Sequence, residues 1–227
     1  MPGAPKRLRC EYLENPLGID ARSPRLSWWL DDDRPAEIQT AYRIIAASDP
    51  AQLDEESGDL WDTGRTESSA TAHIAWAGTA LRSRQRVYWK VRAFDSDGIG
   101  SAWSRAATFE MGLLDVDDWR ARWIGSPMMG GKRTSAQVPA LRRAFDLPQP
   151  PESARLYISA LGIYDVEING KRAIDFELAP GWTDYRKRVR YQVVDVTAHL
   201  VAGENVIGVL LGDGWYCGLL GESERQQ

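Results

Sequence analysis

Short runs in which apolar and polar residues alternate recur along the whole chain of 227 residues. A period of two places successive side chains on opposite faces of a β-strand, and no window shows the three-to-four spacing of a long amphipathic helix. Turn-forming Gly, Asp and Pro residues separate the runs. The expected strands are 25–30, 41–48, 60–64, 86–94, 106–112, 140–147, 154–170, 188–196 and 204–212. The pattern predicts a mainly β protein.

The segment GLLDVDDWRARWIGSP, residues 112–127, interrupts this rhythm with an acidic stretch followed by two tryptophans. We expect a domain boundary here, with domains at 1–114 and 115–227. A chain of this length suits two domains of about 100 residues, each with its own core.

Both halves read as β-sandwiches. In the first, Val87, Trp89 and Val91 alternate with polar or larger neighbours, and a hairpin around DSDGIGS returns the chain through Phe109. This pairing resembles the last two strands of a fibronectin type III or immunoglobulin-like domain. In the second half, Asn169-Gly170 between strand-like flanks predicts a type I′ hairpin turn.

The charge balance argues against nucleic acid as a partner. Acidic residues number 32 and basic residues 28, a net charge of -4, so no overall positive field would attract phosphates. No run approaches the roughly 18 apolar residues of a membrane span, and the start lacks a signal-peptide core. We therefore expect a cytoplasmic location and no membrane partner. Cys10 and Cys217 fit neither a disulfide framework nor a metal motif, so both are expected to be free thiols.

The stretch WTDYRKRVRYQ, residues 182–192, carries four cations among three aromatics. Strand alternation from this point would send Arg186, Arg188 and Arg190 to one face and Lys187 to the other. A nucleic-acid site would gather its cations on one surface. We interpret the stretch as a solvated outer strand.

Two glycine-containing loops, PGWTDY (180–185) and GDGWYCG (212–218), each place Trp and Tyr beside Asp. Sugars present apolar C–H faces and hydroxyl edges, so a sugar site needs an aromatic platform bordered by carboxylates or amides. The same tryptophans could equally be core residues. On the residues alone, both alternatives stay open.

Five motifs in order, ALGIYDVEING, LAPGWTDYRKRVRYQ, DVT, AGEN and LGDGWYCG, make residues 156–221 resemble the N-terminal jelly-roll domain of bacterial α-L-rhamnosidases, glycoside hydrolase family 78. The run LRCEYLENPLGIDARSPRLSWWL resembles the opening of the same enzymes, whose first domain is immunoglobulin- or fibronectin-like. The resemblance covers essentially the whole chain.

The resemblance implies an ancillary role. Family members hydrolyse terminal α-L-rhamnosyl residues with acidic groups on a downstream (α/α)6 barrel, and no such barrel is recognised here. We expect no catalytic residue, no activity of the chain by itself, and the missing catalytic domain as a partner. The jelly roll is expected to be incomplete at its C-terminal end. Its exposed sheet edge would then favour a homo-oligomer.

In this family the jelly roll can bind rhamnose in a calcium-dependent manner, which gives the two loops a candidate role and makes calcium a candidate cofactor. The implied sugar-binding residues are Asp175, Trp182, Asp184, Asp213, Trp215 and Tyr216, with Asp175 also a calcium ligand. Rhamnose-containing glycans would be the partner. A self-standing carbohydrate-binding module and a purely structural scaffold remain the alternative functions.

Overall fold

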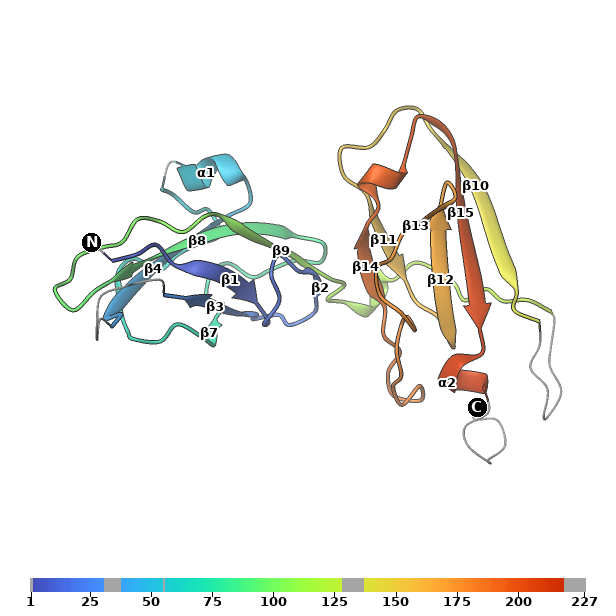
Figure 1. Cartoon of the computed structure of the whole chain (residues 1–227), viewed down its shortest axis with the longest axis horizontal. Coiled ribbons are helices and arrows are strands. Elements are labelled where there is room, and N and C mark those ends of the chain that lie inside the picture. Colours follow the sequence, from blue (N-terminus) through green and yellow to red (C-terminus); the bar gives the residue numbers. More distant parts are fainter. Residues whose placement is uncertain (1, 31–37, 55, 128–136, 219–227) are drawn as a thin grey trace. The chain divides into compact units, whose positions relative to one another are not determined.

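The computed structural model describes residues 2–30, 38–54, 56–127 and 137–218. The chain separates into two compact units, Met1–Arg120 and Ala121–Gln227, and both are built mainly from strands (Figure 1). Helix in the described residues is confined to short elements: α1 (Pro50–Asp54), η1 (Val116–Asp118), η2 (Thr197–His199) and α2 (Gly214–Cys217). The mainly β prediction is confirmed. No described helix has the length and apolar character needed to cross a membrane.

The first unit is a sandwich of two sheets. One sheet has the order β1 (Lys6–Cys10), β3 (Arg25–Trp29), β7 (Ile74–Ala75). The other has the order β2 (Leu17–Ile19), β9 (Ala107–Met111), β8 (Arg86–Phe94), β4 (Ala41–Ala47), β5 (Trp61–Asp62), and β6 (Thr66–Glu67) also pairs with β4. Along β8, every second residue from Val87 to Ala93 is buried, as the alternation in the sequence predicts.

Large aromatic residues from both sheets fill the core of the first unit. Trp28 of β3 meets Trp89 of β8 and Phe109 of β9 in one apolar cluster, and the thiol of Cys10 is buried beside them. Burial raises the pKa of this thiol to about 12, so Cys10 stays protonated. Two sheets closing on a tryptophan-centred core give the immunoglobulin-like architecture expected for this half.

The two buried tryptophans of this core differ in their hydrogen bonding. The indole Nε1 of Trp28 donates to Oε1 of the buried Gln39 at 3.0 Å, whereas Nε1 of Trp89 has no partner among the described residues. Phe in place of Trp28 would leave the Gln39 oxygen unpaired, but Phe in place of Trp89 would remove a group that is already unpaired.

We therefore expect Trp28→Phe to lower the free energy of unfolding by about 2 kcal/mol more than Trp89→Phe, although both changes remove the same atoms. Denaturant titration of the full chain, followed on the transition that these variants shift, measures both costs. Equal costs would contradict the assignment of the Gln39 bond.

The segment that leaves the first unit is bonded to it. Arg84 N–H donates to the Gly112 carbonyl at 3.0 Å, and Leu114 N–H donates to Ser83 Oγ at 2.8 Å. Ser83 Oγ in turn donates to the Asp118 carboxylate. The boundary expected after residue 114 lies within this tethered segment.

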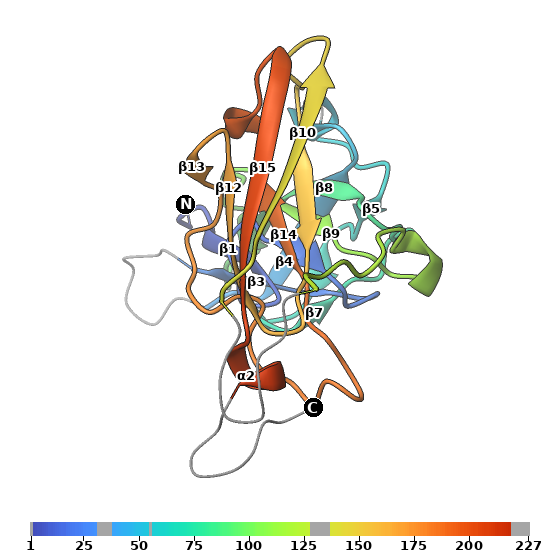
Figure 2. The same ribbon diagram turned by 90° about the vertical axis from the view of Figure 1, so that its right-hand side faces the viewer.

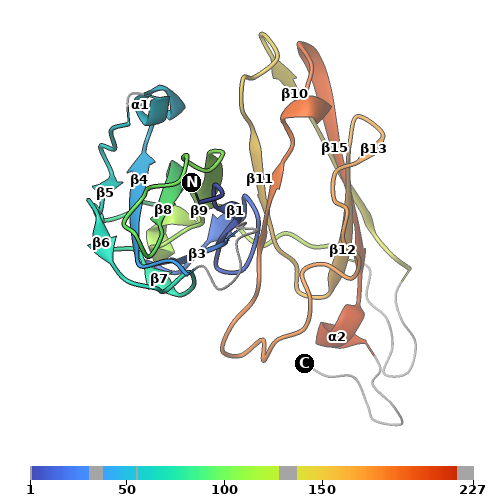
Figure 3. The same cartoon turned by 60° about the vertical axis from the view of Figure 1, so that its left-hand side comes forward.

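The second unit also has two layers. One sheet has the order β10 (Ala140–Leu147), β15 (Gly203–Gly212), β12 (Ile163–Ile168), β13 (Lys171–Arg172), seen nearly face on in Figure 2. The second layer pairs β11 (Arg155–Ile158) with β14 (Gln192–Asp195), and Figure 3 shows β11 facing the larger sheet. Tyr164, Val166 and Ile168 of β12 point into the core between the layers. This is the jelly-roll half; residues 219–227, where the domain was expected to be incomplete, lie outside the described residues.

A hydrogen-bonded pair of asparagines, the buried Asn205 and the exposed Asn169, ties the hairpin turn after β12 to the start of β15. Asn205, fully buried, donates from Nδ2 to the carbonyls of Val201 and Gly203, both at 2.9 Å. Its Oδ1 accepts from Val201 N–H and from Asn169 Nδ2, both at 2.9 Å. Asn169 and Gly170 have φ of 53° and 73°, so the type I′ turn is confirmed.

Two expected strands differ from the structure. The run 154–170 is divided into β11 and β12, because Gly162 at a φ of 123° turns the chain between them. The run 188–196 is wrong in its first half, since β14 begins only at Gln192. The short strands β1, β2, β6, β7 and β13 were not expected.

Candidate functional site

The structure brings together the two aromatic loops singled out in the sequence. The indole rings of Trp182 and Trp215 stack with centroids 6.2 Å apart and planes 5° from parallel. Beside them, Tyr185 and Tyr216 meet edge to face at 5.3 Å. We call these four residues the aromatic corner. Trp182 is 56% exposed, so it is not a core residue and one of its faces is available to a ligand.

A tight turn shapes the first loop. The carbonyl of Asp184 accepts the N–H groups of Lys187 and Arg188, both at 2.9 Å, and Thr183 Oγ1 donates to the Arg188 carbonyl. These bonds replace the strand ladder expected from residue 188, which explains why the predicted division of cations between two sheet faces is wrong. Arg186, Lys187 and Arg188 are all exposed on the turn.

The base of this loop is anchored to the sheets by neutral groups. Tyr164 Oη donates to Gln192 Oε1 at 2.7 Å, and Gln192 Nε2 donates to the Pro180 carbonyl at 3.1 Å. Tyr164 N–H also donates to the Ala179 carbonyl at 2.8 Å, and the Ala179–Pro180 peptide is cis. Burial raises the pKa of Tyr164, which keeps its hydroxyl a donor. The loop carrying Trp182 is thus held by β12 and β14.

Close backbone approach positions the second loop. A Cβ on Gly162 would lie 2.3 Å from the Gly212 carbonyl oxygen, and one on Gly214 would lie 2.8 Å from Cγ2 of Ile163. Only glycine allows the chain to leave β15, pass the start of β12 and begin α2 at once. Trp215 and Tyr216 lie in this first turn, which directs them to the partner loop.

The predicted acidic residues have different surroundings. Asp184 lies 3.4 Å from both Arg186 Nε and Lys187 Nζ, at the exposed end of the first loop. The Asp213 carboxylate accepts from Cys217 Sγ at 3.4 Å within the turn of α2. Asp175 is exposed in the segment that follows β13. Within the described ranges, no three His, Cys, Asp or Glu side chains gather closely enough to hold a metal ion.

Tyr185 is the site residue that the sequence reasoning did not select, although it lies in a stretch already notable for its aromatics. Its phenol oxygen is covered and has no hydrogen-bond partner within the described part of the chain. Burial raises the pKa of this phenol, so it remains a neutral donor. The corner therefore combines an exposed indole face and a second indole stacked on it, and the exposed Asp184 follows in the same loop. That combination suits the C–H face and hydroxyl edge of a sugar.

Comparison with known families agrees with this division of the chain. Residues 5–115 match the family described as Rha78A-like, N-terminal immunoglobulin domain, and residues 149–227 match the alpha-L-rhamnosidase N-terminal domain. An alpha-L-rhamnosidase of Formosa agariphila is 40% identical over 217 residues, which cover 93% of this chain and 23% of that protein.

Solved structures show the same relationship. The alpha-L-rhamnosidase of Dictyoglumus thermophilum superposes with a TM-score of 0.90 at 39% identity, over 94% of this chain and 25% of that one. The native enzyme of Aspergillus terreus gives a TM-score of 0.85 at 34% identity, over 99% and 25%. The chain thus spans about a quarter of the length of these relatives.

Proposed function

The chain belongs to the α-L-rhamnosidase family as its N-terminal two-domain region, and from this premise we propose that it is an ancillary region whose second unit binds a rhamnose-containing glycan at the aromatic corner. The observation that carries the proposal is the stacked, exposed indole of Trp182. Rhamnose is a 6-deoxy sugar, so its ring carries a methyl group. Its C–H face would lie on the indole of Trp182 while its hydroxyls meet polar groups of the loop such as Asp184.

Hydrolysis belongs, in this proposal, to the remaining three quarters of the relatives' length. A glycosidase needs two carboxylates placed on either side of the scissile bond. The acidic groups in the two loops of the corner are engaged locally, Asp184 with its neighbouring cations and Asp213 with Cys217. The pure chain is expected to show no turnover of an aryl α-L-rhamnoside.

Calorimetric titration of the chain with L-rhamnose, with L-fucose as control sugar, tests the binding. We expect rhamnose-specific heat, and we expect Trp182→Ala to weaken binding at least about ten-fold, or about 1.4 kcal/mol. Trp29→Ala is the matched control, because Trp29 is a similarly exposed tryptophan, 52%, on β3 of the first unit. Equal binding by both variants would place the sugar elsewhere.

The same titration with calcium and then with a chelator tests the role proposed for Asp175. Heat that vanishes with the chelator would support calcium-dependent binding through that loop. Heat that persists would assign binding to the aromatic corner alone. A complete absence of heat would favour the scaffold, in which the loops pack against the rest of the enzyme.

A further inference from the structure

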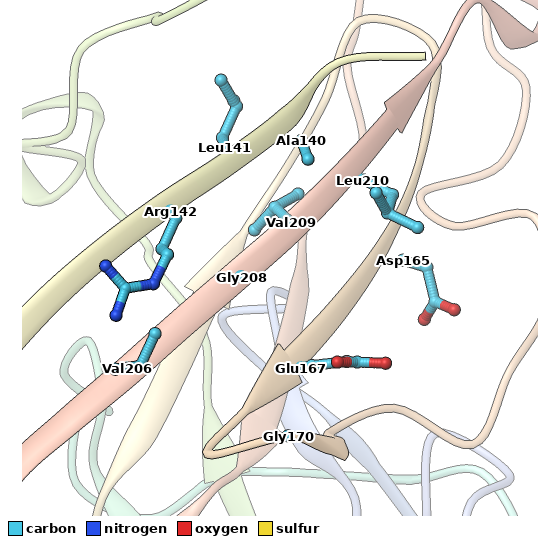
Figure 4. A pocket seen from close by; sticks show the side chains of 10 residues that line it. All are labelled: Ala140, Leu141, Arg142, Asp165, Glu167, Gly170, Val206, Gly208, Val209 and Leu210. Carbon is cyan, nitrogen blue, oxygen red and sulfur yellow. The ribbon is translucent and has the colours of Figure 1, made fainter.

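A groove crosses the outer face of the large sheet in the second unit, away from the aromatic corner loops. It has a volume of about 390 Å³ and runs over β10, β15 and β12 (Figure 4). This is within the size range of small-ligand sites in proteins, roughly 300–1,000 Å³. Its floor is apolar, formed chiefly by Val206 and Leu210 of β15.

Gly208 of β15 lies between Val206 and Leu210 in the floor of the groove. A Cβ built on Gly208 would meet no atom within 4 Å, so the hollow exists because this strand residue has no side chain. The residue does not have the positive φ at which glycine is needed, so backbone conformation does not require it there. A β-branched residue would suit the strand better.

Two opposite charges border Gly208 in a single cross-strand row. Arg142 pairs in register with Gly208 from one side, and Glu167 pairs with it from the other. Directly opposed residues point to the same face, and two strand spacings separate the charged residues by roughly 10 Å. Figure 4 shows the two side chains on either side of Gly208. Neither has an ion pair or hydrogen bond with another described residue; the nearby Asp165, by contrast, pairs with Arg172 at 3.0 Å.

We propose that this groove is a second carbohydrate site, which takes a neutral saccharide lying across Gly208. Arg142 offers only hydrogen-bond donors and Glu167 only acceptors, so the occupant must carry both kinds of group on its edges. Its face must be apolar enough for the Val206 and Leu210 floor. A hydroxylated sugar ring meets both demands, whereas Glu167 repels a phosphate or a polyanion. The site is independent of the aromatic corner.

The test is to record two-dimensional amide NMR spectra of the full chain while adding a neutral rhamnose-containing disaccharide. We expect the Gly208 amide and its strand neighbours to shift. The indole N–H signals of Trp182 and Trp215 report separately on the aromatic corner, so failure at one site is distinguishable from failure at the other.

The decisive variant is Gly208→Val, which fills the groove. We expect it to keep or raise the thermal stability of the second unit and to abolish the shifts at the groove. Glu167→Gln, which retains an acceptor, should weaken the shifts less than Glu167→Ala. Shifts confined to the aromatic corner, or groove shifts unchanged by Gly208→Val, would overturn the proposal.

Discussion

Replacing Asn205 with alanine is expected to lower the free energy of unfolding of the second unit by about 3 kcal/mol. The change removes the Asn205 partner of four polar groups at once: the N–H and carbonyl of Val201, the carbonyl of Gly203 and one N–H of Asn169. Val201, Gly203 and Asn169 are exposed residues, but all four bonds are made to an Asn205 side chain that is fully buried. Few surface changes approach this size.

Chemical unfolding of the full chain measures this loss, and Glu204→Ala is the matched control. Glu204 is the neighbouring residue on β15 and is exposed, so its removal should change stability by less than about 0.5 kcal/mol. If Asn205→Ala were as mild as Glu204→Ala, water would have to satisfy the freed groups, and the hydrogen bonds of Asn205 would not be structural.

Gly162→Ala is expected to destabilise the second unit by more than about 3 kcal/mol and to separate the ring pairs of the aromatic corner. The new methyl would lie 2.3 Å from the Gly212 carbonyl oxygen, a backbone atom that cannot turn away, and the φ of 123° adds strain. Relief requires the end of β15 to separate from the start of β12. Trp215 and Tyr216 follow directly after that end, so their rings would lose contact with those of Trp182 and Tyr185.

Gly203→Ala is the control that separates backbone strain from the steric clash of the added methyl group. Its φ of 83° is also unfavourable for a side chain, but nothing lies within 4 Å of the added methyl, so the cost should be about 1 kcal/mol. Near-ultraviolet circular dichroism reports the stacked indoles. We expect the contribution of this indole pair to the signal to survive in Gly203→Ala and to be lost in Gly162→Ala, while the tryptophans packed in the first unit keep theirs. Its survival in both variants would show that the two loops are held together by other contacts.

Burial periodicity made much of the fold predictable. The alternation in 86–94 and the runs 140–147 and 204–212 correspond closely to β8, β10 and β15, because a strand with one buried face must alternate. Asn169-Gly170 was equally direct, since both residues accept the positive φ of a type I′ turn.

Other features depend on contacts that distant segments make. Residues 184–188 form a turn and not a strand because the Asp184 carbonyl accepts two N–H groups. The alternation of residue types in the sequence does not reveal these hydrogen bonds. The stacking of Trp182 on Trp215 was not predictable from two separate loops, although both loops were selected. The groove escaped notice for the same reason, because Arg142, Gly208 and Glu167 become neighbours only through sheet register.

Ser83 and Arg84 form hydrogen bonds with residues 112–118, so a recombination point in the gene keeps the first unit intact only if it lies after this segment. A crossover at Gly112 would graft a foreign neighbour onto a first unit that had lost the Leu114 and Asp118 partners of Ser83. A crossover after Arg120 would transfer them intact. The immunoglobulin-like unit therefore carries the hydrogen bonds that hold its own C-terminal segment, and a recombination point after Arg120 would transfer the unit with all of them.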